Sequence, residues 1–275
     1  MSEDYPNSET PITHNPAPDP QKSLIGYLLK ILLVVAGGLL LLLAVFILVI
    51  QPISYMRRME VPMHMQWTNL TEQELSRQAS RYFEEIDRRA VKQNFTSVKL
   101  FKSYAPSPWR REGKLYLSPD SRVALIAACL WYQDHPQFFL EFLTFFDNGR
   151  ELVTTNLPPR GNHKEDPEWR TELAMPRFRD LFQLLRKHNQ AMEDAGKTGG
   201  TPILLTPETA ESTVTQFQDK ANAWRVEQGL LQKDNEHQVY RPTYQAAVKN
   251  ILLQYKRLIK RQIAEAKMAR APKKP

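Results

Sequence analysis

Residues 123–146 read VALIAACLWY, QDHPQ and FFLEFLTFF, and this stretch decides the fold of the soluble part of the chain. Each apolar run is about ten residues long, whereas a membrane-spanning helix needs about 20 apolar residues. The polar break, which contains Pro136, prevents the two runs from forming one helix. Because both runs are short, rich in aliphatic and aromatic residues and joined by turn residues, we predict a β-hairpin.

The second run is apolar on both faces of the predicted strand. Phe138, Leu140 and Phe142 alternate with Phe139 and Leu143. This pattern is typical of a central strand that is covered on both sides. The alternative is that one of the two faces meets a partner or the membrane.

Turn sequences at residues 105–108, 118–121 and 147–149 divide the region around the hairpin into further strands. We predict a sheet of four or five antiparallel strands. Cys129, the only cysteine in the chain, lies in the first apolar run, where a buried side chain is expected. A single cysteine excludes an intramolecular disulfide.

Helical periodicity is present on both sides of the predicted sheet. Residues 71–74 have the sequence of a capping box, which predicts that a helix begins there. Pro176 is suited to the first turn of a second helix, and a third is predicted from about Pro207. A long amphipathic helix is predicted over residues 243–270. The fold class is therefore α+β, an antiparallel sheet flanked by helices.

Residues 31–50 form a run of 20 residues without a charged or polar side chain. At about 1.5 Å per residue, a helix of this length covers the roughly 30 Å hydrocarbon core of a bilayer. A cleaved signal peptide is the alternative, but its apolar core is shorter and ends in a small-residue cleavage site. We therefore predict one uncleaved membrane anchor. The residues expected at its two interfaces are Tyr27, Lys30, Tyr55, Arg57 and Arg58.

Composition divides the chain into five segments. They are a disordered, acidic, proline-rich tail (1–23), the anchor (24–50), a linker (51–70), the soluble α+β domain (71–240) and a basic amphipathic helix with its tail (241–275). The short-range Lys and Arg counts on the two sides of the anchor are equal, so the positive-inside rule gives no orientation. Because an unfolded acidic tail is suited to translocation, we expect the soluble domain in the cytoplasm.

The net charge of +7 arises in the last segment. Residues 51–240 hold 25 basic and 25 acidic residues, whereas residues 241–275 hold ten basic residues and Glu265 alone. An apolar stripe with helical spacing runs along this segment, and basic residues line the other side. The candidate anion-binding residues are Lys249, Lys256, Arg257, Lys260, Arg261, Lys267 and Arg270.

Four interpretations of this helix are open. The first is a solvated helix whose stripe packs on the domain, and the second is a helix on an anionic membrane surface. The third is a binding element for an acidic protein, and the fourth is a binding element for nucleic acid. A homomeric coiled coil is disfavoured because it would bring like charges together.

A short stretch bears on nucleic acid. Gly229, Leu230 and Leu231, a polar gap, and then residues 240–243 (YRPT) resemble the helix end, wing and second strand of winged-helix regulators. The resemblance covers about 15 residues and implies binding of nucleic acid. Pro242 departs from the pattern because it removes a strand hydrogen bond. A plain hairpin between two helices is the alternative.

No catalytic or cofactor motif is complete. Residues 196–198 (GKT) lack the first glycine of a phosphate-binding loop, which would fall at Ala191. The six histidines lack metal-ligand spacing, so no metal is expected, and His188 is predicted at the solvent boundary of its helix. The acidic residues 165–168 are predicted to form a solvated turn.

These observations favour a membrane-anchored, non-catalytic interaction or scaffold protein that needs no cofactor. Its basic C-terminal helix would contact anionic lipid or an acidic protein. The alternatives are a membrane protein that binds nucleic acid and an enzyme with an unrecognised site.

Overall fold

The chain divides into two compact units, Met1–Ile50 and Gln51–Pro275. A computed structural model describes residues 20–63, 66–104, 109–132, 135–158, 167–178, 180–197 and 199–270.

The first unit is a helix with apolar residues on every side. α1 (Pro20–Val45) continues into a π-helical turn, η1 (Phe46–Ile50). Its aliphatic side chains are exposed, which in a water-soluble helix would leave a large apolar area in contact with water. Within the described residues one helix, between Tyr27 and Arg58, is long and apolar enough to cross a membrane. The prediction of one N-terminal helix that is long and apolar enough to span a membrane is therefore confirmed.

A seven-stranded sheet, in the order β2-β3-β4-β5-β6-β7-β8, forms the centre of the second unit. Neighbouring strands are antiparallel except for β7 and β8, which are parallel. The strands are β2 (Trp67–Asn69), β3 (Thr96–Tyr104), β4 (Trp109–Leu117), β5 (Ala124–Tyr132), β6 (His135–Phe145), β7 (Glu151–Thr155) and β8 (Arg170–Ala174).

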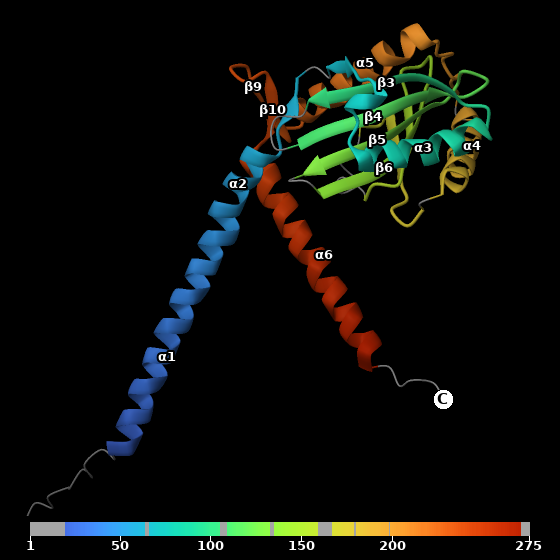
Figure 1. Cartoon of the computed structure of the whole chain (residues 1–275). Coiled ribbons are helices and arrows are strands. Elements are labelled where there is room, and N and C mark those ends of the chain that lie inside the picture. The colour runs from blue at the N-terminus through green and yellow to red at the C-terminus, as the bar shows by residue number, and fades with distance from the viewer. Residues whose placement is uncertain are drawn as a thin grey trace, which may run out of the picture. The chain divides into compact units, whose positions relative to one another are not determined.

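Helices cover both faces of this sheet (Figure 1). Side chains of α3 (Arg77–Val91) and α4 (Leu181–Lys197) form a core cluster with one face. Side chains of α5 (Pro207–Glu227) form a second cluster with the other face. Because successive strand residues point to opposite faces, β6 contributes to both clusters. The predicted hairpin and its central, doubly covered strand are confirmed as β5 and β6.

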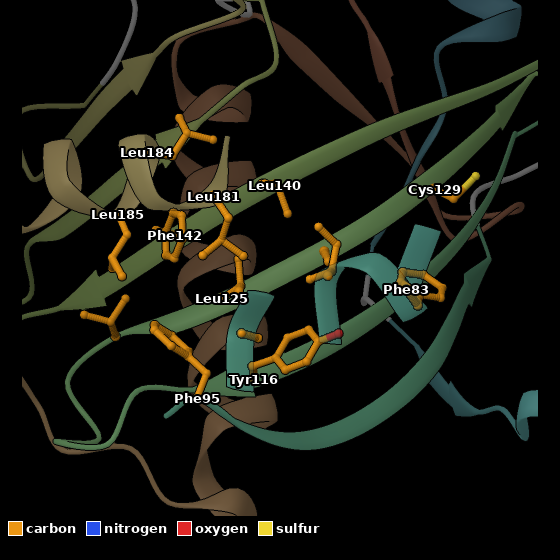
Figure 2. Close-up of a cluster of buried hydrophobic side chains, with 14 of the residues drawn as sticks. Phe83, Phe95, Tyr116, Leu125, Cys129, Leu140, Phe142, Leu181, Leu184 and Leu185 are labelled. Carbon is orange, nitrogen blue, oxygen red and sulfur yellow. The ribbon is translucent and has the colours of Figure 1, made fainter. Parts of the chain in front are cut away.

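The first core cluster contains large buried aromatic side chains from the sheet and from α3 (Figure 2). Phe142 and Tyr116 come from the sheet, Phe83 from α3 and Leu181 from α4. Each is at most 2% exposed. Burial of one such side chain contributes about 1.5–3 kcal/mol, so the layers are held together mainly by this apolar contact. Cys129 belongs to the same cluster and is buried, as predicted.

A second, three-stranded antiparallel sheet has the order β1-β10-β9. It consists of β1 (Val61–Pro62), β10 (Val239–Pro242) and β9 (Leu231–Asp234). Two helices adjoin it along the chain, α2 (Gln51–Arg58) before β1 and α6 (Tyr244–Arg270) after β10. The predicted C-terminal helix thus forms within one residue of its expected start.

The predicted number of four or five strands is wrong. β2 was missed because it has three residues, and it lies in the range 51–70 that was interpreted as a linker. β8 was missed because it pairs in parallel with β7 and follows a long connection. Such pairing is not encoded by local turn residues, which is why hairpin patterns did not reveal it.

Two predicted helix starts are also wrong. Thr71 N donates to Glu74 Oε2 at 2.7 Å as a capping box requires, but this box closes only the 3-10 turn η2 (Glu72–Glu74). α3 begins at Arg77, because Ser76 Oγ accepts from Ala79 N at 3.2 Å.

The second helix starts five residues beyond Pro176, at Leu181. Asp180 Oδ1 accepts from Phe182 N at 2.7 Å, so an aspartate rather than the proline sets the N-terminus of α4.

Candidate interaction surface

The candidate surface belongs to α6, and its position in the second unit is set where α6 packs against α2 (Figure 1). Gln51 Nε2 donates to the Tyr255 hydroxyl at 2.8 Å, and that hydroxyl donates to Gln51 Oε1 at 3.1 Å. Pro52 is buried beside Gln51. The two-way hydrogen bond fixes which turn of α6 lies next to the first residue of α2.

The small sheet holds the other ends of these two helices. Glu60 Oε1, just after α2, lies 2.7 Å from Arg241 Nη2 in β10. The same Arg241 nitrogen lies 3.2 Å from Asp234 Oδ2 in β9. A hydrogen bond from the backbone N–H of His237, the largest cause, and the nearby charge of Arg241 lower the pKa of Asp234. The arginine therefore stays paired with an ionised carboxylate at neutral pH.

These contacts make α6 antiparallel to α2. α2 ends and α6 begins at the small sheet, because β1 follows α2, β10 precedes α6, and the two strands pair. At the far end, Tyr255 contacts Gln51, the first residue of α2. The helix from Lys256 onward therefore extends beyond the start of α2.

The two halves of α6 have different environments. In the first half Ala246, Ala247 and Ile251 are buried against the rest of the unit. In the second half Leu258, Ile259 and Ile263 are 50%, 53% and 51% exposed. Within the part of α6 whose side chains are described, the apolar stripe is therefore buried at Ile251, half-buried at Tyr255 and exposed at Ile259 and Ile263.

Basic residues adjoin this uncovered stripe. The side chains of Lys249, Lys256, Arg257 and Lys260 are exposed. The backbone of Arg261, Lys267 and Arg270 continues the helix, while their side chains lie outside the described residues. Of the residues expected at a membrane interface, Tyr27, Lys30, Arg57 and Arg58 are exposed and Tyr55 is half-buried.

The prediction for His188 is wrong. Its ring is 0% exposed and lies between two threonines, with Nε2 2.9 Å from Thr144 Oγ1 and Nδ1 2.9 Å from Thr154 Oγ1. Burial lowers the pKa of the imidazole to about 3. Because Thr144 Oγ1 donates to the Arg122 carbonyl oxygen at 3.2 Å, we assign the proton to Nε2. The ring is a neutral structural hydrogen-bonding group that joins α4 to the sheet.

A buried ionic cluster was not found by sequence reasoning. Arg170 Nη1 lies 2.9 Å from Glu151 Oε2, and Arg170 Nη2 lies 3.6 Å from Glu172 Oε2. Desolvation raises the pKa of Glu151 to about 6, although the Arg170 charge opposes the shift. The one sequence signal for such a cluster is the alternation of Glu, Arg and apolar residues within short strands. This pattern is not specific for a buried ionic cluster.

The other sequence motifs carry no new chemistry in the fold. Lys197, from the Gly-Lys-Thr motif, lies in the last turn of α4 and pairs with Asp194 at 2.8 Å. The acidic residues 165 and 166 lie outside the described residues. Among the described residues, no group of three or more His, Cys, Asp or Glu side chains is placed to hold a metal ion.

The hairpin that resembles a winged-helix wing does form, as β9 and β10 between α5 and α6. The inner side of α5 is buried against the large sheet through Val214 and Phe217. Its outer side carries a shallow hollow with three carboxylates. The residues that line the hollow are Glu208, Glu211, Ser212, Thr215, Gln216 and Asp219.

Comparisons with protein families, with curated proteins and with solved structures gave no match to this chain. The interpretation of the surface therefore rests on its geometry and charge.

Proposed function

We propose that this chain is a membrane-anchored, non-catalytic interaction protein whose contact surface for an anionic partner is the second half of α6. The observation that carries the proposal is the coincidence of exposed apolar and exposed basic side chains on one helical segment, among the residues whose side chains are described. Leu258, Ile259 and Ile263 are exposed beside Lys256 and Lys260. An amphipathic basic helix of this kind is typical of binding to anionic lipid or to acidic protein surfaces.

The proposed absence of catalysis rests on what the buried polar groups do. His188 is held neutral by two threonines, and Glu151 is paired with Arg170. Both groups are at most 5% exposed, and a catalytic acid or base must reach its substrate. Their partners account for their burial, so a structural role explains them.

Nucleic acid is the less favoured anionic partner. In the winged-helix arrangement the helix before the wing approaches the nucleic acid, and here that helix is α5. The outer side of α5 presents Glu208, Glu211 and Asp219, although Lys99 pairs with Glu211. Carboxylates on that face repel phosphate, which disfavours docking in this mode.

The proposal is tested with the full chain in neutral phosphatidylcholine nanodiscs. The soluble probes are poly-glutamate, anionic vesicles and duplex DNA. We expect the wild type to capture poly-glutamate and anionic vesicles at low salt and to lose both as salt rises, because exposed charges are screened. The double variant Lys256→Glu and Lys260→Glu should lose this capture.

The matched control is Lys92→Glu with Arg186→Glu, which makes the same change in charge at exposed positions outside α6. The control should bind like the wild type. Equal loss in both variants, or capture that persists at high salt, would show that α6 is not the contact surface. Capture of DNA alone would favour the nucleic-acid alternative.

We further propose that the second unit lies in the cytoplasm, where anionic lipid headgroups are abundant. The acidic, proline-rich segment 1–23 and the net charge of residues 241–275 support this orientation. Reporter fusions after Pro275 in native-like membranes test it. A reporter that is active only outside the cytoplasm would contradict it and would direct the search to an acidic protein on that side.

A further inference from the structure

The contact between Gln51 and Tyr255 ties α6 to the first residue of α2. Gln51 directly follows Ile50, the last residue of the uncharged run 31–50. Its side chain is hydrogen-bonded to Tyr255. If residues 31–50 cross a bilayer, as the proposed function assumes, Tyr255 is held where the chain leaves the hydrocarbon core. This step therefore rests on the proposed function.

The remainder of α6 is too long and too charged to continue into the bilayer. α6 runs toward the start of α2 and extends past Tyr255 to Arg270. Those residues cover roughly 22 Å at 1.5 Å per residue. The headgroup region on one side of a bilayer is only about 5–8 Å thick. Lysine and arginine are costly in the hydrocarbon core, so the charges of this part of α6 favour a position along the membrane surface over one across the bilayer.

The side chains of α6 match such a position. Ile259 and Ile263 are four residues apart and lie on one side of the helix. Lys256 and Lys260 are each one turn from members of the stripe and are exposed. Their aliphatic stems can follow the apolar surface while the ammonium groups remain among the headgroups.

We infer that the second half of α6, from Lys256 onward, docks on the anionic surface of the membrane that holds the anchor. Leu258, Ile259 and Ile263 enter the boundary between headgroups and acyl chains, and Lys256 and Lys260 bind anionic lipid phosphates. The domain is thereby held to the membrane at two points, the anchor and α6.

Two other occupants fit the same surface less well. A second copy would place Lys256 and Lys260 beside the same basic residues of its neighbour, which is repulsive. An acidic protein satisfies the charges, but it must be recruited from solution. The membrane is attached to Gln51 through the chain, so its effective concentration at α6 is always high.

The test measures the depth of single labelled positions in the full chain. Ile263→Cys places an environment-sensitive fluorophore on the stripe. Gln254→Cys, nine residues earlier and therefore about two and a half turns away, places it on the opposite side. Gln254 is exposed, and the native Cys129 is buried, so labelled wild type gives the background. Proteoliposomes contain phosphatidylcholine alone or with phosphatidylglycerol.

We expect the label at position 263 to be quenched by a nitroxide lipid and shielded from iodide when phosphatidylglycerol is present. The label at position 254 should remain accessible to iodide. In phosphatidylcholine alone the lipid quenching at position 263 should be weaker. Lys256→Glu with Lys260→Glu should reduce it in the mixed vesicles to the same level.

Three results overturn the inference. If iodide quenches both labels with phosphatidylglycerol present, the helix lies in solution. The label at position 263 could be shielded from iodide without quenching by lipid, which means that protein covers the stripe. Equal quenching in the two lipid compositions excludes a role for anionic lipid.

The same samples separate this failure from failure of the proposed function. If the chain still captures poly-glutamate while lipid does not quench the label at position 263, the proposed function stands and the inference of membrane docking fails. Chain that is released from the vesicles by an alkaline wash is not anchored, and both then fail.

Discussion

His188 shows how a single buried group makes the stability of the domain depend on pH. Its folded pKa is about 3, against 6.5 for an exposed imidazole. Below pH 6.5 the unfolded chain binds a proton that the folded chain does not bind. The contribution to stability is thus complete above pH 6.5 and decreases as the pH falls toward 3, by about 1.4 kcal/mol for each pH unit.

We predict that the His188→Gln variant loses this dependence. Urea unfolding of the full chain in mild detergent, followed by tryptophan fluorescence, gives the free energy of unfolding between pH 7 and pH 4. The difference between wild type and variant should shrink as the pH falls. Taking the difference cancels the contribution of Glu151 to the pH dependence of stability. That contribution has the opposite sign, because the raised pKa of about 6 means that the folded form of Glu151 binds the extra proton.

His135→Gln, the same substitution at an exposed site at the start of β6, is the control and should follow the wild-type curve. If the difference in the free energy of unfolding between the wild type and His188→Gln is constant with pH, the assignment of His188 as a neutral, buried imidazole is contradicted.

Arg170 is predicted to be the most sensitive charged residue of the domain. Its side chain is 4% exposed and faces two glutamates that are 5% and 7% exposed. Arg170→Met leaves these carboxylates without their cation, and removal of one member of a buried ionic group costs about 3–5 kcal/mol. The same unfolding measurement at neutral pH checks this loss, which should diminish at low pH as the carboxylates become protonated.

Lys197→Met is the control for Arg170, since it breaks an exposed ion pair with Asp194. Such pairs contribute little to stability, because both charges remain solvated. Similar losses for the two variants would show that the Arg170 cluster is solvated rather than buried.

The residues just discussed define what local sequence could not predict. Cys129 was predicted correctly because its neighbours in the chain are apolar and share its environment. His188 was not, because its partner Thr154 lies 34 positions away. The pattern around His188 shows only that it lies on a helix. Tertiary contacts decide whether that position is exposed to solvent or buried.

At the scale of elements, β3 and β4 are predicted to tolerate no added side chain at Gly113. A Cβ atom there would lie 2.4 Å from Cζ of Phe101. The Phe101 ring cannot withdraw, because it is fully buried and its centroid lies 4.1 Å from that of Trp67. Gly113→Ala should therefore lower the free energy of unfolding by about 1–3 kcal/mol.

Gly196→Ala is the matched control within α4. A Cβ atom at Gly196 meets no atom within 4 Å. Because alanine is the better helix former by about 1 kcal/mol, this variant should be neutral or slightly more stable. Thermal unfolding of the two variants beside the wild type decides the matter, and equal melting temperatures would contradict the close contact at Gly113.

Elements with strong local patterns were predictable, and elements defined by distant pairing were not. α6 was located from its periodicity, and the β5–β6 hairpin from two apolar runs around a turn. β2, with three residues, becomes a strand only because β3 lies beside it. β8 pairs with β7 after a connection of fourteen residues, which no turn motif marks.

At the scale of the whole molecule, sequence indicated the anchor and the basic helix but not the packing of the basic helix against α2. The residues that connect α2 and α6 are 204 positions apart. No periodicity relates them, and the small sheet that brings them together needs β1, which has two residues. The candidate surface was thus predictable in its composition, while its fixed position next to Gln51 required the fold.

The last prediction concerns this connection. Tyr255→Phe removes the hydroxyl that both accepts from and donates to Gln51 and keeps the ring. A hydrogen bond contributes about 0.5–1.5 kcal/mol, so the second half of α6 should open more often. Hydrogen exchange of the backbone amides of α6, measured on the full chain in nanodiscs, should accelerate around Tyr255 and remain unchanged in β5 and β6.

A double-mutant cycle with Gln51→Ala isolates the contact from other effects of each substitution. We expect Gln51→Ala and the double variant to exchange at the same rate as Tyr255→Phe, because either change alone already breaks the pair. Additive acceleration in the double variant would mean that the two residues act independently. Tyr255 would then no longer be fixed beside the first residue of α2, and the link between α6 and the residue that follows the apolar segment would have no structural basis.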